Sequence, residues 1–213
     1  ASFSESEIPK KYQKDYQKVK KEFWIQMNAN SDFVGTRARK GDYFFKKGQI
    51  SKAIEQYESA LALDEVNNQI RVNLATLYYK NQQYKEAENT YLEIIKQVPE
   101  YGAAYYALAL LYSEMQRVDE AIIQLKKAVV YMPNNIRIYY NLGLLYHKKQ
   151  DFKSAEKSFL SGLKIDNTNE NLLYALAFVY VKHNKTEKAK NIILSLLDLY
   201  PNNQQYHNFL KQL

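Results

Sequence analysis

The sequence has no cysteine, few helix-breaking residues and no long apolar run. None of its 213 residues is cysteine, which excludes disulfides, thiolate metal sites, cysteine nucleophiles and covalent haem attachment within this chain. Only 6 glycines and 4 prolines occur, a composition that favours helices over turn-rich β structure. The longest uncharged apolar run, residues 101–112, is about 12 residues long. A helix needs ~20 residues to span a bilayer, so we expect no membrane span.

Charge of one sign is not concentrated in any part of the chain. The formal net charge is +7, and the largest excess in one 34-residue block is +3, in residues 136–169. Proteins that bind nucleic acids usually carry a concentrated basic stripe. The thin spread of lysine is more typical of a solvated surface, so a nucleic-acid partner is not favoured.

A 34-residue period runs through most of the chain. The segment "YGAAYYALALLYSEMQRVDEAIIQLKKAVVYMPNN" aligns with its neighbours on both sides without insertion. Each copy contains two helical patterns separated by a short polar turn, and such repeats decide the architecture of a protein. Five copies are predicted: 34–67, 68–101, 102–135, 136–169 and 170–203.

Small and large side chains alternate at fixed positions when each copy is numbered from 1 to 34. Position 8 is small: Gly41, Ala75, Ala109, Gly143 and Ala177. Position 20 is always alanine: Ala53, Ala87, Ala121, Ala155 and Ala189. Positions 11 and 24 are large: Phe44, Tyr78, Tyr112, Tyr146 and Tyr180, then Tyr57, Tyr91, Leu125, Phe159 and Ile193. Small residues allow two helices to approach, and large ones fill the space beside them.

The ends of the helices carry their own signals. Position 34 is Asn67, Asn135, Asn169 and Asn203, with Tyr101 as the exception. Asparagine there can cap the following helix, which stabilises it by about 1 kcal/mol. Position 32 is Pro99, Pro133 and Pro201, which would end the second helix. Glu65 and Asn167 replace proline in the other two copies.

The spacing of these small, aromatic, alanine and proline positions resembles the tetratricopeptide repeat over residues 34–203. The resemblance implies an all-α, right-handed α–α superhelix with five helix pairs, in which the first helices line a concave groove. The first copy departs most from the pattern, because Lys40 stands where the other copies have leucine.

The two flanks do not follow the repeat. Residues 1–33 predict an N-terminal helical flank with one apolar stripe: Tyr12, Tyr16, Val19, Phe23 and Met27. We expect this helix to cap the first repeat, as repeat arrays require, while a membrane-surface or partner helix is the alternative. Residues 204–213 predict a C-terminal cap helix.

The predicted groove is rich in tyrosine in its C-terminal half. We expect it to be lined by ten residues: Asn73, Tyr79, Tyr106, Tyr140, Asn141, His147, Lys148, Tyr174, Phe178 and Lys182. Tyrosine offers contact area with little entropy to lose, and asparagine can bond an extended main chain. The alternative is that the tyrosines pack on the next repeat.

These residues suit a protein or peptide partner, either acidic or aromatic and apolar. Lysines at the edge would attract acidic ligands. Some co-chaperones of the family that the sequence resembles bind the C-terminal carboxylate of a ligand through a set of side chains called a carboxylate clamp. Val72, Ala103 and Ala107 stand where that clamp needs polar or basic groups, so we expect no carboxylate-clamp adaptor.

Catalytic chemistry is not indicated. The three histidines, His147, His183 and His207, fall at different repeat positions, and a metal site needs three or four convergent ligands. No phosphate-binding glycine loop or nucleophile motif is present. We therefore predict no enzyme activity, metal or cofactor.

Two alternatives stay open. An RNA-binding helical repeat would need base-reading residues in register. The stretch "KKEFWIQMNANSDF" resembles exported bacterial proteins in which a repeat array follows a catalytic or cytochrome domain. This resemblance implies the repeat segment of a larger exported protein with a periplasmic location, and a cytoplasmic location is the alternative. Sequence alone leaves the oligomeric state open.

Overall fold

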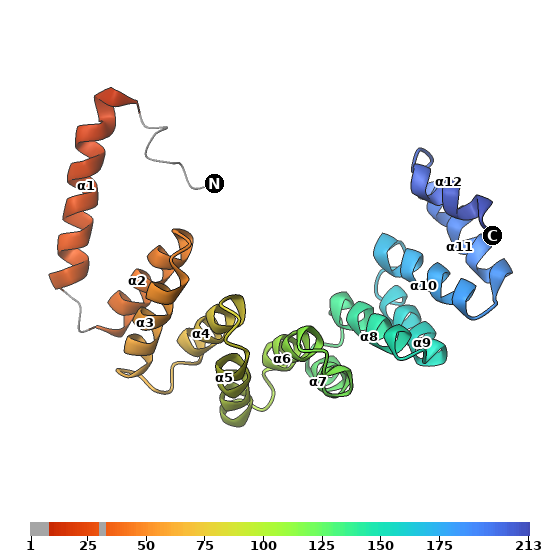
Figure 1. Cartoon of the computed structure of the whole chain (residues 1–213), viewed down its shortest axis with the longest axis horizontal. Coiled ribbons are helices and arrows are strands. Elements are labelled where there is room, and N and C mark those ends of the chain that lie inside the picture. Colours follow the sequence, from red (N-terminus) through yellow and green to blue (C-terminus); the bar gives the residue numbers. More distant parts are fainter. Residues whose placement is uncertain (1–8, 30–32) are drawn as a thin grey trace. The chain divides into compact units, whose positions relative to one another are not determined.

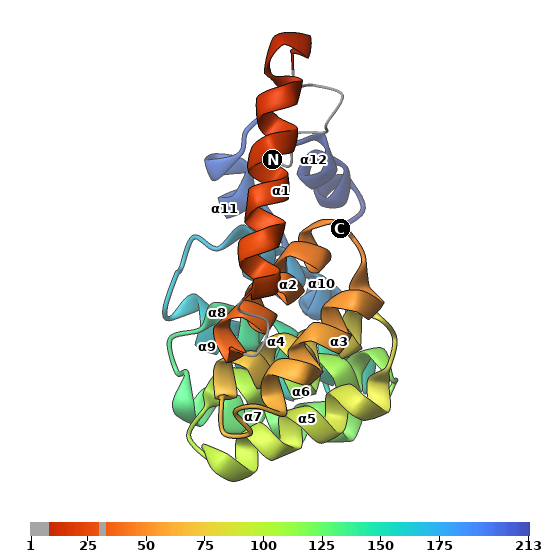
Figure 2. The same ribbon diagram turned by 90° about the vertical axis from the view of Figure 1, so that its left-hand side faces the viewer.

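The chain is helical throughout the part that the structure describes. The computed structural model describes the backbone of residues 9–29 and 33–213 and the side chains of residues 9, 11–22 and 33–213. Within these residues it has no strand and contains twelve helices (Figures 1 and 2): α1 (Lys10–Ala29), α2 (Val34–Lys46), α3 (Ile50–Leu61), α4 (Asn68–Lys80), α5 (Tyr84–Gln97), α6 (Gly102–Glu114), α7 (Val118–Tyr131), α8 (Ile136–Lys148), α9 (Phe152–Leu163), α10 (Glu170–Lys182), α11 (Thr186–Leu199) and α12 (Gln204–Lys211). The predicted all-α solenoid is confirmed.

Two compact units divide the chain, residues 1–94 and 95–213. Unit 1 contains the hairpin of α2 and α3, then α4 and most of α5. Unit 2 contains the hairpins α6–α7, α8–α9 and α10–α11, followed by α12. In unit 2, α10 packs against both α9 and α11, and α12 packs against α11. Within unit 2, a repeat therefore covers the apolar face left open by its neighbour, as expected for a solenoid.

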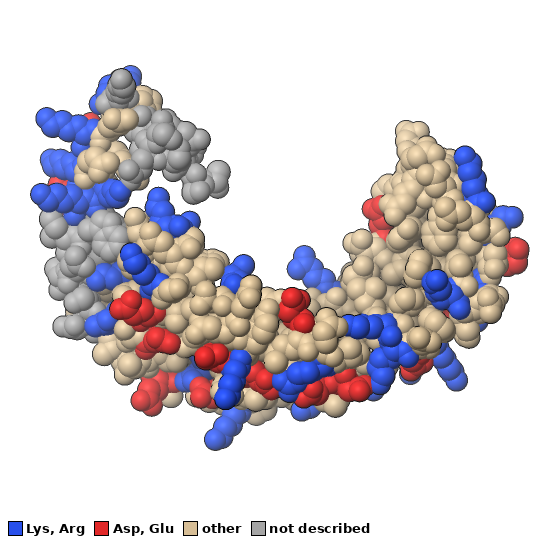
Figure 3. All heavy atoms as spheres, in the orientation of Figure 1, with Lys and Arg blue, Asp and Glu red and all other residues tan. Residues whose placement is uncertain are grey.

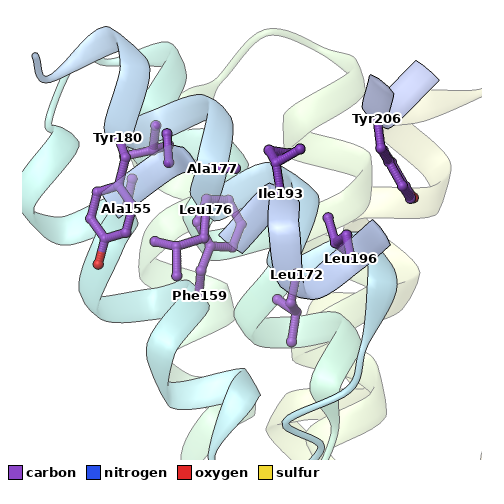
Figure 4. Close-up of a cluster of buried hydrophobic side chains, with 11 residues drawn as sticks. Ala155, Phe159, Leu172, Leu176, Ala177, Tyr180, Ile193, Leu196 and Tyr206 are labelled. Atoms are coloured by element: carbon purple, nitrogen blue, oxygen red, sulfur yellow. The ribbon is translucent and has the colours of Figure 1, made fainter. Parts of the chain in front are cut away.

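Close approach of small and large residues holds each hairpin together. A Cβ atom on Gly143 would lie 2.2 Å from Cε1 of Phe159, and one on Gly41 would lie 2.7 Å from Cε2 of Tyr57. Figure 4 shows Phe159 among the buried side chains of unit 2, beside Ala155 and Leu176. The alanines at position 20 are completely buried. The predicted packing of positions 8, 20 and 24 is therefore confirmed.

The turn within each hairpin repeats the same backbone geometry. Position 15 has a positive φ in every copy: Gly48 (72°), Gln82 (61°), Gln116 (61°), Gln150 (61°) and Asn184 (56°). The next backbone N–H donates to the carbonyl of position 11, as from Arg117 to Tyr112 at 2.8 Å. This pattern satisfies carbonyl groups that a helix end leaves open. Only one copy has glycine there, so the periodic pattern of apolar residues did not reveal this position.

The turns between repeats are tied by side chains. Asn67, Asn135, Asn169 and Asn203 each accept a backbone N–H of the following helix, which confirms the predicted caps. Where position 4 is polar, its side chain also bonds the carbonyl of position 32 in the preceding copy. The Tyr105 hydroxyl donates to Pro99 at 2.8 Å, and the Tyr139 hydroxyl donates to Pro133 at 2.9 Å. In the first turn that lacks proline, the amide of Asn67 donates to Asp64 at 3.0 Å.

The flanking helices lie where the sequence predicts helices. On α1, Tyr12 and Val19 are exposed, and the side chains of Phe23 and Met27 lie outside the described residues. A capping role for α1 therefore stays a prediction. On α12, Tyr206 is buried in the core of unit 2 and Phe209 packs against that core. Among the described residues, no helix is both long enough and apolar enough to cross a membrane.

Candidate functional site

Three large apolar side chains lie exposed at the same repeat position in unit 2. Leu110 on α6, Leu144 on α8 and Phe178 on α10 occupy position 9, and they are 37%, 41% and 41% exposed. Side chains of consecutive first helices connect across this face: Asn141 bonds Tyr106, and the His147 and Phe178 rings lie 5.5 Å apart. We call the surface made by positions 5 and 9 of α6, α8 and α10 the unit 2 face.

The tyrosines of the unit 2 face are half-buried rather than free. The amide of Asn141 donates to the Tyr106 hydroxyl at 3.0 Å, and the amide of Gln205 donates to the Tyr174 hydroxyl at 2.9 Å. Tyr140 and Tyr174 also pack against the core, with the Tyr140 ring 6.2 Å from that of Phe159. The Tyr174 ring also contacts the rings of Tyr206 and Phe209 in the following segment, as the alternative of packing on the next repeat expects.

The predicted basic residues engage aromatic and amide groups at the edge of this face. The Lys182 ammonium lies 5.5 Å from the centre of the Phe178 ring, within the range of a cation–π contact. The Lys148 ammonium donates to the side chain of Gln116 in the preceding repeat. Both lysines are exposed at the surface. The two lysines lie at the border of the apolar stripe, which is the row of Leu110, Leu144 and Phe178.

A hollow of about 450 Å³ lies at the C-terminal end of the unit 2 face, between α10 and α12. Two rings from α10 and one from α12 supply its apolar wall, and amide side chains supply the rest: Tyr174, Phe178, Phe209, Gln204, Gln205, Asn208 and Gln212. No charged residue lines it, and the surface over α12 is largely uncharged in Figure 3. Sequence reasoning assigned α12 only to capping, so it missed these amides.

Unit 1 holds the two remaining predicted residues, Asn73 and Tyr79, in a different chemical setting. Asn73 accepts from Gln69 at 3.2 Å and donates to the Tyr57 hydroxyl at 3.4 Å. Tyr57 in turn donates to the carboxylate of Asp42. These groups surround a small hollow of about 130 Å³. The Asn73 amide is thus already bonded on both sides, and the Tyr79 ring lies 6.1 Å from that of Tyr84.

Burial and the neighbouring carboxylate act together on Tyr57. Its side chain is almost completely buried, and burial raises the pKa of the phenol. The hydrogen bond to Asp42 and the negative charge of that carboxylate raise the pKa further. The neutral phenol is therefore the form that the fold holds.

The ten predicted groove residues fall into two sets. Asn73 and Tyr79 belong to unit 1, and the other eight belong to unit 2. Within unit 2 the structure joins Tyr106 to Asn141 and His147 to Phe178. That all ten act on one ligand stays a prediction.

Two of the three histidines contact aromatic rings. Sequence position placed His147 and His183 apart, yet both rings lie beside Phe152, at 5.7 Å and 5.9 Å between centroids. No group of three or more histidine, aspartate or glutamate side chains that could hold a metal ion occurs in the described part of the chain. The arrangement here is one of ring packing.

Comparison with known proteins gives matches to families and to folds. A family model described as tetratricopeptide repeat matches residues 44–111 and 146–213, and a second, described as TPR repeat, matches residues 112–150. No curated protein matches the sequence significantly.

Solved structures resemble the chain at low sequence identity. One crystal structure of MamA is 20% identical, covers 78% of this chain and 97% of its own, and has a TM-score of 0.71. YrrB, a TPR protein with an unusual peptide-binding site, is 18% identical and has a TM-score of 0.70. The match covers 90% of this chain and 98% of the YrrB chain. A tetratricopeptide repeat protein from Parabacteroides merdae is 19% identical and has a TM-score of 0.74. The match covers 83% of this chain and 70% of the Parabacteroides chain. At these identities the likeness shows the fold, and the family models cover most of the sequence. The chain belongs to the tetratricopeptide repeat family.

Proposed function

We propose that this protein is a non-catalytic scaffold that binds an apolar or aromatic peptide segment of a partner on the unit 2 face. Membership of the tetratricopeptide repeat family supports a role in protein–protein interaction. The observation that carries the proposal is the register of Leu110, Leu144 and Phe178, three exposed apolar side chains on successive first helices. Contiguous exposed apolar surface usually marks an interaction site.

Polar groups beside the stripe would bind the main chain of such a segment. No described residue donates to the Oδ1 atom of Asn141, which leaves one acceptor for a ligand amide. The Tyr106 hydroxyl accepts from Asn141 and keeps its own proton for donation. The uncharged amides between α10 and α12 would continue the same recognition. The YrrB structure shows that a related fold can carry a peptide-binding site.

The chemistry of the stripe argues for an apolar ligand over an acidic one or an RNA strand. The side chains at position 9 in unit 2 have no hydrogen-bonding group, so they cannot read bases by their edges. The lysines lie at the border and already contact Phe178 and Gln116. They would speed the encounter with an acidic partner more than they would hold it.

A peptide selected against the whole protein tests this proposal. Peptides from a displayed random library would be enriched on the immobilised chain, and the best one labelled for fluorescence anisotropy. Leu144→Asp should weaken its binding at least about tenfold, because a charge would be placed in an apolar contact. Leu144 is 41% exposed, so the melting temperature should change little.

Ile123→Asp is the matched control. Ile123 is 51% exposed on α7, a second helix outside the unit 2 face. The control should bind the peptide with unchanged affinity. Equal weakening by both variants, or by neither, would mean that the stripe is not the binding surface.

A further inference from the structure

A second hollow lies on the side of the second helices of unit 2. It is formed by α7, α8 and α9 and has a volume of about 430 Å³. Two lysines and several hydroxyl-bearing residues supply its polar lining: Lys126, Lys157, Tyr139, Tyr146, Ser154, Ser158 and Ser161. No carboxylate lines it. We call it the basic hollow, and it shares no lining residue with the proposed peptide site.

Several donors in the basic hollow have no internal acceptor. The Lys126 ammonium lies 5.9 Å from the centre of the Tyr146 ring, and in the described part of the chain neither Lys126 nor Lys157 forms an ion pair. The hydroxyls of Ser161 and Tyr146 likewise donate to no described residue. The hollow thus gathers positive charge and hydrogen-bond donors without a matching negative group.

Carboxylates near the hollow are held by other partners. Asp151, which precedes α9, accepts the backbone N–H of Ser154 at 3.0 Å as a helix cap. Glu156 of α9 accepts from the Lys185 ammonium at 2.7 Å and from the Tyr180 hydroxyl at 3.1 Å. Neither lines the basic hollow.

Unit 1 has a hollow at largely the same repeat positions, but carboxylates predominate in its lining. It measures about 360 Å³ and is lined by Glu58, Glu65, Glu93 and Arg71 among others. Arg71 is buried there, and its guanidinium donates to the Glu93 carboxylate and to the Glu65 carbonyl. Position 25 is Glu58 in this hollow and Lys126 in the basic hollow. The same backbone site therefore carries opposite charge in the two units.

We propose that the basic hollow binds a tetrahedral oxyanion group, a phosphate or a phosphomonoester, independently of the peptide site. Two ammonium groups supply charge, and the free hydroxyls of Ser161 and Tyr146 supply donors to anionic oxygens, which are the strong class of hydrogen bond. Val129 and Leu142 add an apolar wall that suits the organic part of an ester. The acidic equivalent in unit 1 would repel such a ligand, so it serves as an internal reference.

Titration of the whole ¹⁵N-labelled protein tests the proposal. Inorganic phosphate and phenyl phosphate would be added in separate experiments at constant ionic strength and pH 7.5. Amide signals of residues 126–129 and 154–161 should shift with saturation. The double variant Lys126→Gln, Lys157→Gln should bind at least about tenfold more weakly, since two charge-assisted contacts are lost.

The matched control is Lys127→Gln with Lys190→Gln. Both lysines are exposed on second helices of unit 2, and neither lines the hollow. This variant removes the same net charge and should keep its affinity. Equal binding of both probes would identify the free anion as sufficient, and tighter binding of phenyl phosphate would identify a carried ester; either result supports the site. No saturable shift, shifts spread over surface lysines, or equal losses in both double variants would overturn it.

Discussion

The first helices of the two units present the same repeat positions with different chemistry. In unit 1, position 9 is Asp42 and Thr76, and Asp42 is bonded to the buried Tyr57. In unit 2, the same position is Leu110, Leu144 and Phe178, and all three are exposed. At this position, unit 1 pairs a carboxylate with a buried hydroxyl, whereas unit 2 leaves apolar side chains exposed.

The backbone scaffold beneath these faces is shared. Gly41 faces Tyr57 in unit 1, and Gly143 faces Phe159 in unit 2, in the same helix-to-helix contact. The difference between the faces therefore arises from side chains that the packing does not restrict. Capacity to bind a ligand can vary along a solenoid while its framework stays constant.

Adding one methyl group to the shared framework should have the largest effect. Gly143→Ala would place a Cβ atom against the fully buried Phe159 ring, at 2.2 Å from Cε1. We expect it to lower the free energy of unfolding by about 2 kcal/mol, because overpacking outweighs the better helix propensity of alanine. Urea unfolding monitored by circular dichroism measures the change.

Two further variants would sharpen this result. Gly35→Ala meets nothing within 4 Å and should be neutral or slightly stabilising. Combining Gly143→Ala with Phe159→Leu should recover part of the loss, because the smaller side chain makes room. If Gly143→Ala were as stable as the wild type, the contact between position 143 and the Phe159 ring would have to be loose enough to accept a methyl group.

Removing single hydroxyls should separate the two faces at an intermediate scale. Tyr57→Phe breaks the bond to Asp42 and leaves the carboxylate without its buried donor, so we expect a loss of about 1.5 kcal/mol. The Tyr140 hydroxyl has no partner among the described residues, and Tyr140→Phe should change stability by less than about 0.5 kcal/mol. Thermal and urea unfolding of the two variants at pH 7 make the comparison.

Unfolding at alkaline pH is a second test of the contact between Tyr57 and Asp42. The pKa of Tyr57 is raised in the folded protein, so its contribution is complete below the unfolded pKa of about 10 and is lost as pH rises above it. Wild type should therefore lose more stability between pH 9 and pH 11 than Tyr57→Phe does. Identical pH profiles would mean that burial and the Asp42 contact do not raise the pKa of Tyr57 in the folded protein.

The smallest effect should come from the turn at position 15. Gly48 in unit 1 and Gln150 in unit 2 share a positive φ, of 72° and 61°. Side chains resist this conformation, so Gln150→Gly should stabilise by about 0.5 kcal/mol and Gly48→Gln should destabilise by a similar amount. Opposite signs in the two swaps, measured by chemical unfolding, support equivalence of the turns, and equal signs contradict it.

Much of the fold could be predicted because a strict period exposes it. The small residues at position 8, the alanines at position 20 and the asparagine caps recur every 34 residues, and each reports a local requirement of helix packing or helix ends. The left-handed turn at position 15 escaped prediction because glutamine has no preference for that conformation. The bond from position 4 to the carbonyl of position 32 was also not predicted. Different residue types make it, namely Arg71, Tyr105 and His207, because each side chain is long enough to reach the carbonyl.

The candidate site was only partly accessible from sequence. The register placed Tyr106, Tyr140 and Tyr174 on one face, but it gave no measure of how far their rings sink into the core. It also gave no sign that Asn73 is bonded within unit 1 or that amides of α12 line a hollow. Burial and bonding between repeats depend on side chains of two neighbouring copies, which the pattern of a single repeat does not contain.

The helical class, the packing within each hairpin and the helix caps follow from the amino-acid sequence, because each depends on residues within one period. Tertiary structure decided which apolar groups stay exposed, which polar groups are already paired, and how the two equivalent hollows acquire opposite charge. Those properties arise where neighbouring repeats meet, so they depend on the contact between copies and not on the repeated unit alone.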